Sequence, residues 1–127
     1  MANKKSGEIL VELDKTRVLK FGLNAFAAFE DEMWVTIPAY LMEFSEKTKG
    51  DPGAAMRFFG FKQIRAMLWA GLLHQDQTLT PAGAGDLADK APGETWQDKA
   101  AYLIERVFTA FAGAQEPISK KKGSEEA

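Results

Sequence analysis

The residues that could perform acid–base or metal chemistry are few, and His74 is the only histidine of the chain. A catalytic histidine works with a nucleophile and an orienting carboxylate, and a metal-bound histidine needs further ligands. Asp76 is the nearest carboxylate in sequence, there is no cysteine, and the only serines are residues 6, 45, 119 and 124. Because His74 follows the apolar run that ends at Leu73, we expect it to have a structural role at a helix C-terminus.

Acidic and glycine-rich stretches suggest metal or nucleotide binding but match no motif for either. Consecutive residues of a helix point in different directions, so Glu30, Asp31 and Glu32 cannot form one metal cage. The stretch "DKTRVLKFGLNAF" departs from the calcium-loop pattern. "GAGDLADK" lacks the Lys-Ser/Thr of a phosphate-binding loop and follows no predicted strand. We therefore expect a solvated helix end, no metal and no cofactor.

Two predicted helices, 57–73 and 81–91, have the spacing of a helix-turn-helix pair. A recognition helix presents Arg, Lys, Asn or Gln to base edges, whereas this second helix offers Asp86, Asp89 and a single Lys90. Residues 7–114 contain 11 Lys and Arg against 15 Asp and Glu, although the whole chain carries a net charge of −2. Phosphate binding needs clustered cations, so we expect no nucleic-acid partner. A small DNA-binding regulatory protein is the less favoured alternative.

The elements that must position these residues begin with a β-hairpin. Apolar and polar residues alternate from Glu8 to Leu13 and again from Val18 to Phe21, around the polar turn at Asp14. An isolated hairpin is marginally stable, so we expect it to pack on the helices that follow. The sequence therefore predicts a mainly α fold (α+β), with an N-terminal β-hairpin packed on a bundle of four or five helices.

Helix starts are predicted from capping residues and apolar stripes. Asn24, Thr36 and Thr80 are the predicted N-caps, and the first of these helices should end near Met33. The strongest apolar segment spans 54–73, and the last helix runs from Trp96 with one apolar face. We expect a single domain over 7–114, a flexible N-terminus at 1–6 and a disordered charged tail at 115–127. No apolar run approaches the roughly 20 residues of a membrane helix, so we expect a soluble protein.

Aromatic residues are numerous for a small acidic chain, with nine Phe, three Trp and two Tyr. Core packing and partner binding are equally weighted explanations, because exposed aromatics cannot be distinguished from buried ones by sequence. Apolar surface left exposed usually marks an interaction site. The predicted protein-interaction residues are Phe26, Phe29, Trp34, Tyr40, Phe58, Phe59, Trp69 and Phe108.

Two stretches give the chain a family resemblance. An N-terminal hairpin leads into "RVLKFGLNAFAAFEDEM", and a central "FKQIRAMLWAGLLHQDQTLTPAGAGDLADK" precedes an amphipathic helix and a charged tail. In this order the features resemble the tail assembly chaperones of long-tailed bacteriophages and related gene-transfer particles. The resemblance covers about Arg17 to Phe111.

The resemblance implies a non-enzymatic protein. Such chaperones bind and solubilise the hydrophobic tape measure protein, help recruit tail tube subunits, and commonly self-associate. They act in the host bacterial cytoplasm and are absent from the mature virion. A longer form often arises by ribosomal frameshifting, with which the "SKKKG" at 119–123 is compatible. A structural virion subunit is the other alternative.

Overall fold

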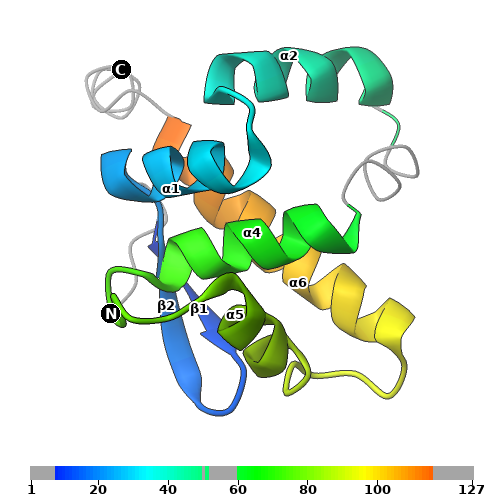
Figure 1. Cartoon of the computed structure of the whole chain (residues 1–127). Helices are drawn as coiled ribbons and strands as arrows, with labels where there is room; N and C mark the ends of the chain where they lie inside the picture. The colour runs from blue at the N-terminus through cyan, green and yellow to red at the C-terminus, as the bar shows by residue number, and fades with distance from the viewer. Residues whose placement is uncertain (1–7, 50, 52–59, 116–127) are drawn as a thin grey trace, which may run out of the picture.

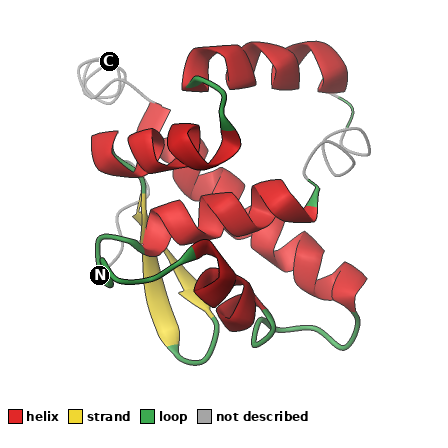
Figure 2. Cartoon of the chain, viewed as in Figure 1, coloured by secondary structure: helices red, strands yellow, loops and turns green. Residues whose placement is uncertain are grey.

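The computed structural model describes residues 8–49, 51 and 60–115. In the described part, an antiparallel hairpin precedes five helices, and Figures 1 and 2 show their arrangement. The elements are β1 (Glu8–Glu12), β2 (Thr16–Lys20), α1 (Leu23–Met33), α2 (Ile37–Thr48), α4 (Phe61–Leu72), α5 (Pro81–Ala88) and α6 (Trp96–Gln115). The predicted mainly α fold with an N-terminal hairpin is confirmed.

The hairpin buries one face, as its alternating pattern predicts. Ile9 pairs with Leu19 and Leu10 pairs with Val18 in the antiparallel register. Ile9, Val11 and Leu19 are buried, whereas Leu10 points outward and is partly exposed. Two bonds tie β1 to α6: Tyr102 Oη accepts from the N–H of Glu12 at 2.9 Å, and Arg106 Nη1 donates to the carbonyl of Leu10 at 3.2 Å.

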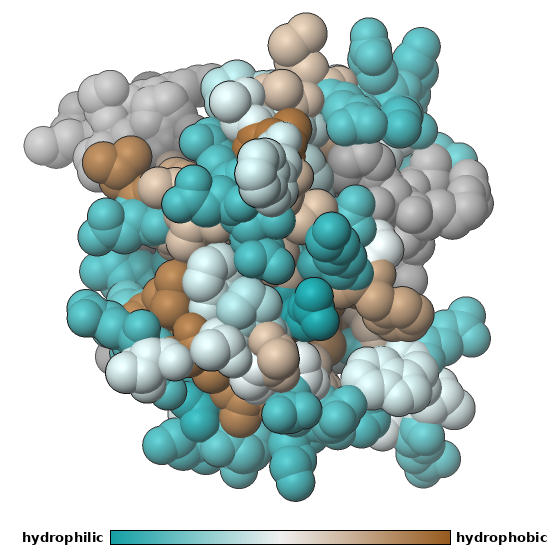
Figure 3. Space-filling model, viewed as in Figure 1, coloured by the Kyte–Doolittle hydropathy of each residue, from teal (hydrophilic) through white to brown (hydrophobic). Residues whose placement is uncertain are grey.

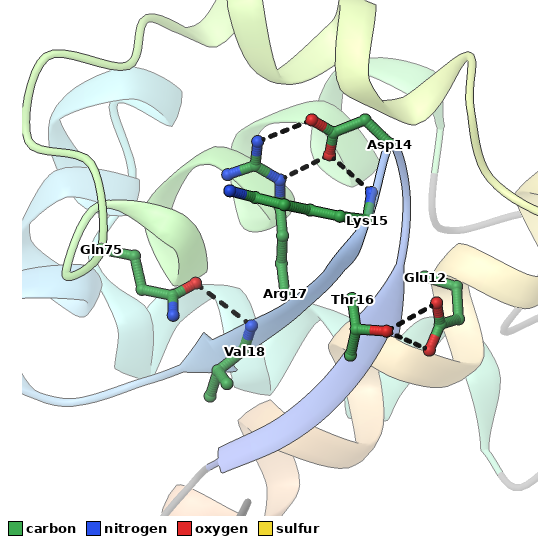
Figure 4. A network of polar contacts seen from close by, with 7 residues as sticks. All are labelled: Glu12, Asp14, Lys15, Thr16, Arg17, Val18 and Gln75. Atoms are coloured by element: carbon green, nitrogen blue, oxygen red, sulfur yellow. Dashed lines mark hydrogen bonds and ion pairs between the residues drawn. The ribbon is translucent and has the colours of Figure 1, made fainter.

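A salt bridge organises the turn between the strands (Figure 4). Arg17 donates two hydrogen bonds to Asp14, from Nε to Oδ1 at 2.7 Å and from Nη2 to Oδ2 at 2.9 Å. The backbone N–H of Lys15 also donates to Asp14 Oδ1. These bonds, above all those from Arg17, lower the pKa of Asp14 from 3.8 to about 2. The charged pair therefore stabilises the turn, and both of its side chains remain accessible to solvent.

α4 is the central helix, since it packs against α1, α5, α6 and β2. Ile64, Met67, Leu68 and Leu72 are buried along it. At Gly71 the helix approaches the hairpin so closely that an added Cβ would lie 2.9 Å from Cδ2 of Leu19. The buried side chains of the hairpin and the helices form one hydrophobic cluster.

Helix starts agree with two of the three predicted caps. Thr36 accepts from the N–H of Ala39 at 3.3 Å, and Thr80 accepts from the N–H of Gly83 at 3.0 Å. The prediction for Asn24 is wrong, because α1 begins at Leu23 with Gly22 as its N-cap. The chain leaves β2 and turns into the helix at this glycine, whose carbonyl accepts the first helical bond, from the N–H of residue 26.

The ends of other predicted segments fall outside the described residues. α4 is described from Phe61, so the predicted helical stretch 54–59 is not covered. The same holds for the predicted flexible residues 1–6 and for 116–127. Gln115, predicted as the first residue of the tail, is instead the last residue of α6.

Candidate functional site

Large apolar side chains lie exposed on several elements of the described surface. Trp34 is 92% exposed, and the partly or largely exposed set also contains Leu10, Leu23, Met42, Phe61, Trp96 and Phe108. Figure 3 shows mostly hydrophilic residues on one face, with hydrophobic residues in separate areas. A surface of this kind, apolar side chains spaced among charged ones, is suited to contacts with another chain.

Two of the predicted interaction residues belong to the core. Phe29 is 1% exposed and Tyr40 is 4% exposed, and their rings meet edge-on across α1 and α2. Burial raises the pKa of the Tyr40 phenol well above its ordinary value of 10. In the folded chain these two rings stabilise the junction of α1 and α2 and offer no surface to a partner.

Two further predicted residues are half-buried and already have contacts within the chain. The ring of Phe26 packs between those of Phe21 and Phe111, with centroid distances of 6.0 and 5.5 Å. The indole Nε1 of Trp69 donates to the carbonyl of Leu79 at 2.7 Å, which joins α4 to the segment before α5. Phe26 and Trp69 therefore act mainly in packing.

The surface retains Trp34 and Phe108 from the predicted set. Phe108 is 37% exposed and its ring lies 5.5 Å from that of Phe44, between α6 and α2. Trp34 lies at the end of α1 and is the most exposed large apolar side chain described. The predicted residues Phe58 and Phe59 lie outside the described residues.

Five exposed apolar residues lie outside the predicted interaction set: Leu10, Leu23, Met42, Phe61 and Trp96. Leu10 lies on the outward face of β1 with Glu8 and Glu12 and alternates with the buried Ile9 and Val11, so period-two patterning could have revealed it. Phe61 and Trp96 are distant in sequence, yet their rings lie 6.1 Å apart in a T-shaped pair. No sequence spacing joins those two residues, because only the packing of α4 on α6 brings them together.

His74 lies just beyond the C-terminus of α4, where the sequence predicts a structural role. Its Nε2 lies 2.8 Å from the carbonyl oxygen of Val18, and Oε1 of Gln75 accepts from the N–H of Val18 at 3.2 Å. Asp76 instead accepts from the N–H and hydroxyl of Thr78, and these bonds lower the pKa of Asp76. The end of α4 is thus bound to the edge of β2 through His74 and Gln75.

An open hollow of about 590 Å³ lies beside this junction. Its walls come from the start of α1, the end of α4 and the residues that flank them, and include Lys20, Leu23, Ala70, Leu73 and His74. Lys20 also lies 3.7 Å from the carboxylate of Glu8. Lys20 and His74 are the titratable residues among those that line the hollow.

The described residues contain neither a cluster of metal-ligating side chains nor a helix that could span a membrane. Among them, no group of three or more His, Asp or Glu side chains is placed to hold a metal ion. The acidic cluster is divided in function: Glu30 Oε2 accepts from the N–H of Ile37 at 2.6 Å, while Asp31 is exposed. None of the described helices combines the length and apolarity needed to cross a bilayer.

The helix pair that suggests DNA binding does form, as α4 and α5. Asp86 is the only charged residue of α5, which otherwise consists of Pro, Ala, Gly and Leu. This composition provides no donor that could read a base edge.

Comparisons of the chain with protein-family models, with curated proteins and with solved structures find no significant match.

Proposed function

We propose that this protein is a phage tail assembly chaperone, which binds the tape measure protein and keeps it soluble without catalysing a reaction. Its action would take place in the host bacterial cytoplasm, and it would leave before the virion is complete. The sequence resemblance over residues 17–111 supports this proposal. A self-associating form and a longer frameshifted form that contacts the tail tube protein are part of the same proposal.

The exposed apolar side chains are the observation that carries the proposal. Trp34, Leu23, Met42 and Phe61 are each more than 60% exposed, on a chain whose body is acidic. Covering apolar surface lowers the free energy by about 25 cal/mol for each Å² that a partner removes from water. Dispersed negative charge keeps the chaperone itself from aggregating. These are the properties that an aggregation-prone client requires.

Co-expression with the tape measure protein of the same phage tests the proposal. The tape measure protein alone should be found in the insoluble fraction, and it should become soluble and co-purify when this chain is present. An unrelated aggregation-prone protein serves as the control and should remain insoluble. A tape measure protein that stays insoluble, or that dissolves without co-purifying, would refute the proposal.

A further inference from the structure

Trp34 combines two unfavourable features at the point where α1 turns into α2. Its backbone is left-handed, with φ 57° and ψ 39°, a conformation that usually belongs to glycine or asparagine after a helix. Its indole is also almost completely exposed. The position needs only a backbone N–H, which donates to the carbonyl of Glu30 at 2.8 Å. Folding therefore does not require a tryptophan here, and such outliers are concentrated at functional sites.

α2 ends in the same way but with an ordinary residue. Lys49 is also left-handed, with φ 43°, and its N–H donates to the carbonyl of Ser45 at 3.0 Å. These two are the non-glycine residues with positive φ in the described part of the chain. The comparison separates the backbone requirement, which both positions share, from the aromatic side chain, which only Trp34 has.

The segment that contains Trp34 is acidic. From Leu23 to Lys49 the chain carries five carboxylates against Lys47 and Lys49. Asp31 and Glu32 lie in the last turn of α1, within three residues of Trp34. Along α2, the exposed Met42 is four residues from Glu46, so the two lie on one face. Figure 1 shows α2 along the outer edge of the molecule, joined to α1 by this short turn.

Trp96 is a second exposed tryptophan, and its ring has contacts within the chain. Trp96 packs against Phe61, and the ammonium of Lys99 lies 5.5 Å from the centre of its ring. In the described residues the ring of Trp34 has no comparable aromatic or cationic contact. An exposed indole that directly follows the acidic last turn of a helix attracts a cation in two ways, through the face of the ring and through the nearby negative charges.

We propose that Trp34 anchors a docking site for a partner helix whose apolar stripe is flanked by lysine and arginine. The inference depends on the proposed function, because it names the chemistry of the tape measure segment that this chain binds. The indole and the exposed side of α2 cover the apolar stripe, and the carboxylates of Asp31, Glu32 and Glu46 face the partner's cations. Charge complementarity selects this occupant over an acidic helix.

Two synthetic amphipathic helices of equal length and identical apolar stripe test the site. One carries Lys and Arg beside the stripe, and the other carries Glu. Calorimetric titration of the full chain should show tighter binding of the basic peptide, and its affinity should fall as ionic strength rises. The basic peptide should also shift the indole N–H resonance of Trp34, while that of Trp69, which is bonded to Leu79, stays in place.

Trp34→Gly is the decisive variant because the substitution suits the left-handed backbone and should fold. It should weaken binding of the basic peptide by about 30-fold, the loss typical of an anchor residue. Lys49→Gly makes the same backbone change at the end of α2 and should retain binding. Trp96→Phe changes the exposed pair formed by Phe61 and Trp96, and it should retain binding as well.

Three results would overturn the inference: equal affinity for both peptides, undiminished binding by Trp34→Gly, or concentration-dependent self-association that this variant abolishes. The third result would assign the surface to a second copy of this chain. The proposed function is judged separately, since it fails if the wild-type chain leaves the tape measure protein insoluble. If Trp34→Gly solubilises that protein as well as the wild type does, only the present inference fails.

Discussion

The ring of Tyr40 meets that of Phe29 edge-on, with centroids 5.1 Å apart and planes inclined by 74°. Edge-to-face geometry of this kind stabilises an aromatic pair beyond the burial of its area. The contact fastens α2 to α1, and the N–H of Ile37 reinforces it by donating to Glu30 on the other helix. The junction that positions Trp34 therefore depends on two rings that a partner cannot reach.

Phe29→Ala should lower the free energy of unfolding by about 3–5 kcal/mol, because it removes a fully buried ring and leaves a cavity. Trp34→Gly should raise that free energy by up to about 1 kcal/mol, since glycine adopts the left-handed backbone without a steric penalty. Urea unfolding followed by far-UV circular dichroism measures both. Equal effects of the two substitutions would contradict the assignment of one ring to the core and the other to the surface.

Gly71 and Gly85 should respond in opposite ways to alanine. At Gly71 the new methyl group would meet Leu19 at 2.9 Å and Phe21 at 3.2 Å, both buried. We expect Gly71→Ala to lower the free energy of unfolding by about 1–2 kcal/mol, because overpacking exceeds the gain in helix propensity.

Gly85→Ala is the matched control, since its methyl group would meet only Cδ of the exposed Arg65 at 3.3 Å, and that side chain can move. It should raise the free energy of unfolding by up to about 1 kcal/mol. Thermal unfolding of the two variants provides the comparison. A destabilised Gly85→Ala together with an unaffected Gly71→Ala would contradict the close contact of α4 with β2.

Periodicity and capping predicted much of the fold because both are local. The alternation in 8–21 identified the buried hairpin face, and Thr36 and Thr80 identified two helix starts. The prediction for Asn24 is wrong because α1 begins at Leu23, one residue earlier, with Gly22 as its N-cap. A residue whose side chain could cap a helix does not act as the cap when the preceding strand already determines where the helix begins.

Burial of single aromatics depends on tertiary packing, so the interaction set could be predicted only in part. Phe29 and Tyr40 belong to the core because α2 packs against α1. No spacing of residues in the sequence predicts that packing. The exposed pair of Phe61 and Trp96 was not predicted either, because the two residues become neighbours only when α4 packs on α6. Trp34 was recognisable from its place beside three acidic residues at a helix break.

The pair of Asp14 and Arg17 predicts a measurable acid dependence. The folded-state pKa of Asp14, about 2, lies below its ordinary value of 3.8. A depressed pKa adds stability that is present above pH 3.8 and is lost as the pH falls from 3.8 towards 2. Carboxyl-carbon NMR should show Asp14 titrating near pH 2 in the wild type and close to 3.8 in Arg17→Gln. An unchanged midpoint in the variant would contradict the salt bridge as the cause.

His74 provides a test of whether the protein performs chemistry. His74→Ala removes the contact with the carbonyl of Val18 at 2.8 Å, and the loss should be about 0.5–1.5 kcal/mol in the free energy of unfolding. The variant should solubilise the tape measure protein as well as the wild type at a temperature where both are folded. A complete loss of solubilisation by a folded His74→Ala would indicate a direct role for the imidazole.

The proposed function also predicts where the protein is found after assembly. Under this proposal, exposed side chains such as Trp34 and Met42 would hold the tape measure protein only until the tail tube encloses it. Release would then cost little free energy, because tube subunits would cover the apolar residues of the tape measure protein. Quantitative mass spectrometry of purified virions should detect tape measure and tube proteins but only traces of this chain. A fixed ratio of this chain to tube subunits would instead identify a structural component of the virion.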